Sequence, residues 1–168
     1  MATLGGRQVE QNDLGVMAAG AAALIFSFLP FWGVSYKVAG HGGLSASLSA
    51  WHGLPLLGVL MLVAASAIVA ARVFGGVTLP TVPVGWHVIV AGLAVLGAVI
   101  VILRGLTYGN NGYSAFGNSV SSGVKWGGYL LFLAAIAEAV FAVMALRESG
   151  ESLSFDRGTQ ETPPPVTG

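Results

Sequence analysis

Residues 126–146 read WGGYLLFLAAIAEAVFAVMAL, and Glu138 is the one charged side chain in this apolar run. A bilayer crossing needs about 20 predominantly apolar residues. Backbone N–H and C=O groups in hydrocarbon must bond within their own segment, so the run predicts a helix. Residues 126–146 therefore predict a membrane span that carries an acid inside it.

Three further stretches have the same character, at about residues 14–34, 54–74 and 85–103. Hydrophobic residues make up 55% of the chain and charged residues 8%, against about 25% charged in a soluble domain. So little charge does not cover a water-facing surface. The sequence predicts an all-α fold, a transmembrane four-helix bundle over residues 14–147 whose partner is the lipid bilayer.

The tryptophans lie at the predicted ends of these spans. They are Trp32, Trp51, Trp86 and Trp126. Tryptophan favours the headgroup layer, where the ring is half buried and its N–H finds a partner. All four are therefore expected to be interface anchors.

The two ends of the chain are polar, and residues 1–13 and 148–168 are expected to be disordered. The first span is longer than the apolar core of a signal peptide, which favours a retained anchor. The basic residues divide four against three between the two sides of the membrane: Arg7, Arg72, Arg147 and Arg157 against Lys37, Arg104 and Lys125. This division predicts a multi-pass protein of the cell membrane with both termini in the cytoplasm.

Glu138 is expected to face protein, because an ionised carboxylate in hydrocarbon costs on the order of 3 kcal/mol. It shares a helical stripe with Ala134, Ala142 and Ala145, and small residues allow helices to approach closely. Spans two and four both start on the outer side, so counting depth along the helices predicts a polar cluster of Glu138 with Ser66 first, then Arg72 or His87. Two interpretations stay open, a proton or cation site and a protonated or hydrogen-bonded packing residue.

The outer connections are the least regular parts. Leu44, Leu48 and Trp51 recur at helical spacing, which favours a short helix lying in the interface. The same segment alternates Leu44, Ala46, Leu48 and Ala50, so a strand is the alternative. Residues 104–125 are rich in Gly, Asn, Ser and Tyr and are interpreted either as an ordinary loop or as an adaptable recognition surface.

The residues for most enzyme chemistry are missing. The chain has no Cys, and it lacks the phosphate-binding, zinc-protease and serine-hydrolase motifs. The outer connections hold no acid, which leaves His41 and His52 as a poor pair of metal ligands. We expect no catalytic residue, no metal, no cofactor and no binding of nucleic acid.

Four stretches carry a resemblance: Ser27–Val34 (SFLPFWGV), Ser49–Gly53 (SAWHG), Leu103–Tyr108 (LRGLTY) and Gly127–Leu131 (GGYLL). On these, roughly residues 14–146 resemble uncharacterised small four-span integral membrane proteins of actinobacteria. These motifs bring no catalytic residues with them. The layout, with an outer tryptophan after the first span, is also similar to claudin-like proteins. The cysteine pair of that family is absent, so this resemblance is rejected.

Three hypotheses for function follow. The leading one is an accessory or scaffold subunit of an envelope complex, with a membrane-protein partner or a second copy of the chain. The alternative is a small transporter or channel that uses Glu138. The third is a membrane enzyme that uses His41 or His52 on the outer face.

Overall fold

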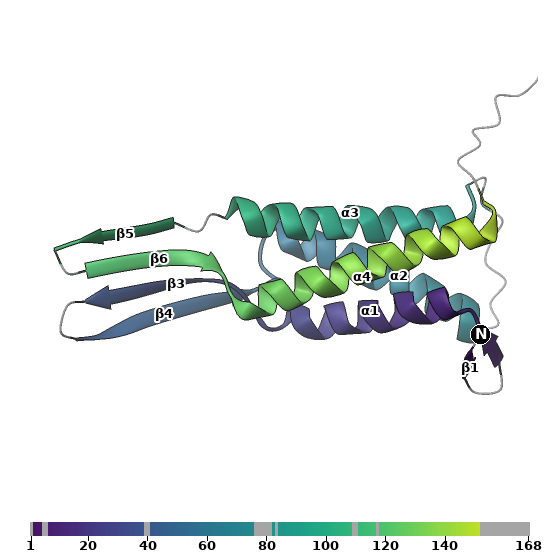
Figure 1. Ribbon diagram of the computed structural model, residues 1–168, viewed down its shortest axis with the longest axis horizontal. Coiled ribbons are helices and arrows are strands. Elements are labelled where there is room, and N and C mark those ends of the chain that lie inside the picture. Colours follow the sequence, from purple (N-terminus) through teal and green to yellow (C-terminus); the bar gives the residue numbers. More distant parts are fainter. Residues whose placement is uncertain are drawn as a thin grey trace, which may run out of the picture.

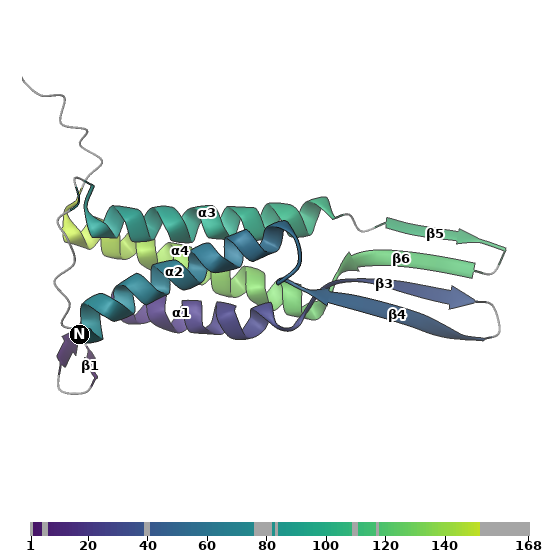
Figure 2. The same cartoon turned by 180° about the vertical axis from the view of Figure 1, so that it is seen from behind.

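A computed structural model describes residues 2–4, 7–38, 41–75, 82, 84–108, 111–116 and 118–151. Four helices lie side by side along the long axis of the molecule (Figures 1 and 2). They are α1 (Gln11–Ser27), α2 (Leu54–Phe74), α3 (Trp86–Thr107) and α4 (Trp126–Ser149). Contacts run from α1 to α2, α2 to α3, α3 to α4 and α4 back to α1, so the helices form a closed ring. We call this ring the helical body.

Three of these helices, α2, α3 and α4, are long and apolar enough to cross a membrane. α1 has 17 residues and ends at Ser27. The prediction of one apolar span over residues 14–34 is therefore wrong at its outer end, where the chain turns and enters a strand at Pro30. Proline has no N–H to donate to a helix, and it disfavours helical backbone at the residue before it.

The prediction of an all-α fold is also wrong. The segments between α1 and α2 and between α3 and α4 form a four-stranded antiparallel sheet in the order β4-β3-β6-β5. Its strands are β3 (Pro30–Val38), β4 (His41–Ser49), β5 (Asn111–Ala115) and β6 (Asn118–Val124). This sheet, which we call the projecting sheet, extends beyond one end of the helical body (Figure 1).

The central pairing of the projecting sheet joins two distant parts of the chain. Trp32 lies opposite Val124 and Tyr36 lies opposite Val120, so β3 and β6 hold two hairpins together. β4 is the strand that the alternation of Leu44, Ala46, Leu48 and Ala50 predicted as the alternative. The prediction of a short interfacial helix is wrong, since residues 43–51 form a strand and a turn. Glycine and asparagine, which recur in these segments, are depleted in strands. The segments therefore show little local preference for strand and depend on the ladder for their structure.

The two ends of the chain also differ from expectation where the structure describes them. Strands β1 (Ala2–Leu4) and β2 (Arg7–Val9) pair in a short antiparallel hairpin, and α1 begins directly after it, at Gln11. At the other end α4 continues to Ser149, and Gly150 ends it in the left-handed conformation that glycine adopts without strain. Residues 152–168 of the predicted disordered tail lie outside the described residues.

The core of the helical body consists of small and branched side chains. Leu62, Leu131 and Val69 are fully or almost fully buried, with alanines between them. α2 and α3 approach closely at Gly58 and Gly97, where a Cβ on either glycine would lie within 3 Å of the other's carbonyl oxygen. Such close approach is typical of helices that pack in lipid. The hydrophobic effect does not drive helices together there, and small residues permit the close van der Waals packing that does.

Candidate functional site

The buried acid of α4 lies inside the ring of helices. Glu138 has no exposed surface, and neither Ala142 nor Ala145 exposes more than a few per cent. The stripe that the spacing indicated therefore faces protein rather than lipid. The Ser66 hydroxyl on α2 lies 2.9 Å from Glu138 Oε1 and donates to it. Ser66 is thus the partner that depth counting placed first.

The same hydroxyl reaches a second acceptor, the carbonyl oxygen of Val16 on α1, at 3.1 Å. A serine has one proton to donate, so it serves one acceptor well at a time. When the carboxyl group of Glu138 is protonated, it can donate to Ser66 while Ser66 donates to Val16, and each proton is used. A neutral acid therefore gives both protons an acceptor, and it is the form with the smaller cost of burial.

Gly20 makes room for this contact. A Cβ at that position would overlap the Ser66 hydroxyl and lie 3.2 Å from Glu138 Oε1. Three helices thus meet at the carboxyl group, with α1 supplying the space, α2 the hydroxyl and α4 the acid. We call Gly20, Ser66 and Glu138 the buried cluster.

One atom of the buried cluster has no partner. Glu138 Oε2 is buried and forms no hydrogen bond within the part of the chain that the structure describes. A groove of about 240 Å³ lies between α1 and α2 and is lined in part by Ser66 and Gly20. Its other lining residues are all apolar: Met17, Ala21, Leu24, Val63, Ala67 and Ala70. Water needs two to four polar partners to stay in such a space, so this groove is not a polar path to the acid.

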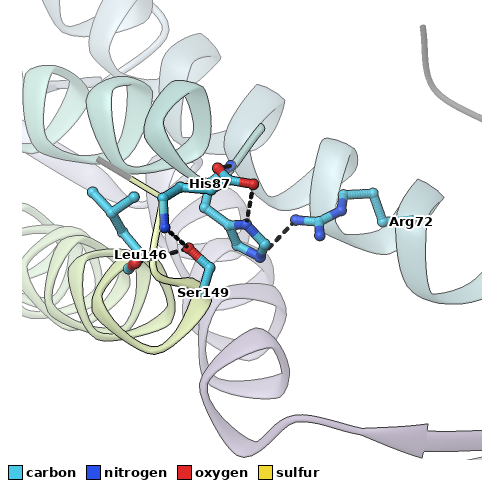
Figure 3. A network of polar contacts seen from close by, with 5 residues as sticks. Arg72, His87, Leu146 and Ser149 are labelled. Carbon is cyan, nitrogen blue, oxygen red and sulfur yellow. Dashed lines mark hydrogen bonds and ion pairs between the residues drawn. The ribbon is translucent and has the colours of Figure 1, made fainter. Parts of the chain in front are cut away.

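Arg72, near the end of α2, and His87, at the start of α3, form a different cluster (Figure 3). These two helix ends lie away from the projecting sheet (Figure 1). Arg72 Nη1 lies 3.0 Å from His87 Nε2. His87 Nδ1 lies 3.1 Å from Glu151 Oε1, and the backbone N–H of His87 donates to Glu151 Oε2 at 3.0 Å. The end of α2, the start of α3 and the residue just beyond α4 are therefore tied together. We call Arg72, His87 and Glu151 the inner cluster.

The carboxylate of Glu151 is the acceptor at the centre of the inner cluster, with the His87 ring and the His87 backbone N–H on either side of it. Partial burial raises the pKa of the Glu151 carboxyl, but hydrogen bonds from the His87 side chain and backbone outweigh burial and hold that pKa below its usual range. The carboxylate also lies at the N-terminus of α3, where free N–H groups favour negative charge.

Glu151 is the residue that sequence reasoning missed. Its approach depends on Gly85, because a Cβ there would overlap the carboxylate. It also depends on Ser149, whose hydroxyl donates to the Leu146 carbonyl and accepts from the Glu151 N–H (Figure 3). The signal in the sequence is Ser149-Gly150-Glu151, which is typical of the end of a long helix. This signal does not indicate which helix the acid will contact.

The four tryptophans do not share one environment. Trp86 and Trp126 begin α3 and α4. Trp51 Nε1 donates to the buried Ser27 hydroxyl at 2.9 Å, and its ring stacks on Phe28. Trp32 lies in β3 rather than at the end of a span, with its ring 5.4 Å from that of Tyr108. Trp32 and Trp51 therefore join the helical body to the projecting sheet, which is a more specific role than membrane anchoring.

The two outer histidines are not brought into a described site. His52 is exposed in the turn before α2, and the side chain of His41 lies outside the described residues. Within residues 2–151, apart from the gaps given above, no group of three or more His, Asp or Glu side chains is placed to hold a metal ion.

Comparison with known proteins gives no relative, because no protein-family model, no curated protein and no solved structure matches the chain. The resemblance to small actinobacterial membrane proteins stays a prediction.

Proposed function

We propose that the chain is a non-catalytic membrane subunit that presents the projecting sheet to a partner, as an accessory or scaffold component of an envelope complex. The observation that carries the proposal is the sheet itself. It extends from the helical body, and its two outer strands, β4 and β5, each have a single neighbour in the ladder. Open strand edges are templates for pairing with another chain.

The exposed side chains of the projecting sheet support the same proposal. Leu44 is 78% exposed and Tyr113 is 74% exposed, and Phe116 at the tip of the second hairpin is uncovered. Uncovered apolar and aromatic side chains mark interaction surfaces when they gather in one region. Tyrosine, serine, glycine and asparagine, which are abundant here, provide adaptable contacts.

The position of the sheet relative to the membrane is part of the proposal. α1 is about 25 Å long by its residue count, close to the thickness of about 30 Å of a hydrocarbon core, and it packs between α2 and α4. We propose that it crosses the membrane with the other three helices. Both termini then lie on one side, which the basic residues assign to the cytoplasm, and the projecting sheet lies outside the cell membrane.

Site-directed photocross-linking in native membranes tests the proposal. A photoreactive residue is placed at Leu44, at Tyr113 or, as the control, at Leu57, which is 48% exposed on α2. We expect one protein to be captured from both sheet positions and not from Leu57. Recovery of an uncross-linked monomer from both sheet positions would overturn the proposal.

The second candidate is a transporter or channel that uses Glu138. It is favoured by the burial of the acid, by the unpartnered Oε2 and by the groove that reaches Ser66. The apolar lining of that groove and the separate position of the inner cluster count against it. Flux in liposomes that is present in the wild type and falls on Glu138→Gln would establish this candidate. Flux that is absent, or unchanged in that variant, would eliminate it.

A further inference from the structure

A second groove lies on the outside of the helical body, between α3 and α4, which lie side by side in Figure 1. It has a volume of about 480 Å³. Two of its small lining residues, Ala98 and Ala139, are more buried than the larger Val99 and Val140 that follow them on the two helices. Small side chains below larger ones create the hollow.

The groove is suited to an apolar occupant. α3 and α4 are both apolar enough to cross a membrane, and the side chains along the groove are apolar except at one end. In hydrocarbon such a groove is filled either by a lipid chain or by another helix, since an empty groove would forfeit dispersion contacts. The choice between them rests on the polar end and on the length.

The polar end of the groove is Arg147, in the last turn of α4. Its side chain is exposed and forms no hydrogen bond or ion pair with any residue that the structure describes. The next acid along the helix, Glu148, lines a separate hollow beside Glu10 and does not line this groove. A guanidinium at the end of a span lies at headgroup depth, where a phosphate is the matching bidentate acceptor.

The groove is no longer than one leaflet. Its lining runs from Ile136 to Arg147 along α4 and from Val95 to Ile102 along α3, which is about 16 Å and about 10 Å at the rise of an α-helix. Half of a hydrocarbon core is about 15 Å. A helix from another protein would follow the whole thickness of the bilayer, whereas a lipid chain with its headgroup at Arg147 fits the observed extent.

We propose that the groove between α3 and α4 binds one acyl chain of an anionic phospholipid, and that Arg147 holds the phosphate of its headgroup. This inference is independent of the function proposed for the projecting sheet. It requires only that α3 and α4 lie in a bilayer.

Native mass spectrometry of the full chain in mild detergent tests the proposal. The delipidated protein is given equal amounts of phosphatidylglycerol and phosphatidylcholine with identical acyl chains. Both headgroups carry a phosphate, but the choline cation of phosphatidylcholine offsets the charge of its phosphate. One basic side chain is worth about 1 kcal/mol at an anionic surface, so the wild type should retain phosphatidylglycerol about fivefold over phosphatidylcholine. Arg147→Gln should bring that ratio close to one.

A steric variant separates the groove from general contact with lipid. Val140→Trp, on the side of the groove, should reduce the retention of both lipids at least several-fold. Leu133→Trp is the matched control, because Leu133 is 65% exposed on α4 but does not line the groove. Val99→Trp on the opposite side replaces Val140→Trp if that variant fails to fold.

Four results would overturn the proposal. The first is equal retention of the two lipids by the wild type. The second is a preference that survives Arg147→Gln. The third is retention that survives the tryptophan on the side of the groove. The fourth is a dimer of the chain that disappears with Val140→Trp while lipid binding is unchanged, which would assign the groove to a second copy.

Discussion

The helical body and the projecting sheet are built by different physics. The helical body buries Leu62 and Leu131 completely and packs helix against helix through alanine and glycine. In the projecting sheet, every described side chain of β4 from Leu44 to Leu48 is exposed. The first region is therefore held by packing, and the second by backbone hydrogen bonds to neighbouring strands. A substitution of the same residue type should therefore change the free energy of unfolding greatly in the helical body and little in the projecting sheet.

The largest contrast is expected for leucine. Leu62→Ala should lower the free energy of unfolding by about 2–5 kcal/mol, because it leaves a cavity in a core that cannot collapse around it. Leu44→Ala, in the projecting sheet, should change it by less than about 0.5 kcal/mol. Helical circular dichroism during unfolding in mild detergent measures both. Equal effects would mean that the sheet has a packed core of its own.

Glycine gives the next contrast, and this one lies within the helical body. Gly20→Ala should cost about 1–3 kcal/mol, because the new methyl group overlaps the Ser66 hydroxyl. Gly92→Ala is the matched control, since nothing lies within 4 Å of its added Cβ. That control should stabilise α3 by about 0.5–1 kcal/mol. The two variants should therefore shift the same unfolding transition in opposite directions, and a shared direction would contradict the geometry of the buried cluster.

A proline in the sheet tests whether the two regions unfold separately. Ser121 lies in β6 between β3 and β5, so Ser121→Pro should remove a ladder hydrogen bond. We expect hydrogen exchange to accelerate across β3 to β6. In α2 to α4 the free energy of opening derived from exchange should change by less than about 1 kcal/mol. Acceleration throughout the helices would show one cooperative unit.

The inner cluster should give the smallest effect. The pKa of Glu151 is lower in the folded chain than its ordinary value of 4.5. Its contribution is therefore fully present above pH 4.5 and is lost as the pH falls through the lower folded value. Because the side chain is about one-third exposed, Glu151→Gln should cost about 1 kcal/mol or less at neutral pH.

The pH dependence provides the check on this last prediction. The difference in stability between the wild type and Glu151→Gln should shrink as the pH is lowered below 4.5. A difference that stays constant from about pH 7 to about pH 3 would show that the contact of Glu151 with His87 and the start of α3 contributes nothing through its charge.

The sequence alone determined the apolar helices and the inward position of Glu138. Both follow from local properties, because hydropathy is summed over neighbouring residues and an alanine stripe at helical spacing marks a packing face. The pairing of Glu138 with Ser66 was also within reach, since depth in a bilayer can be counted along each helix. The expected contact of Arg72 or His87 with Glu138 is wrong, because Arg72 contacts His87 and His87 contacts Glu151 instead.

Only the tertiary structure decided the projecting sheet, the inner cluster and the groove at Arg147. Trp32 pairs with Val124, although α2 and α3 lie between them in the sequence. No local pattern of serine and glycine specifies such a distant partner. Backbone N–H and C=O groups are the same in every residue except proline, so a ladder between distant segments leaves little trace in the side chains. Burial in lipid selects its residues strongly, and this is why the helices could be read from the sequence and the sheet could not.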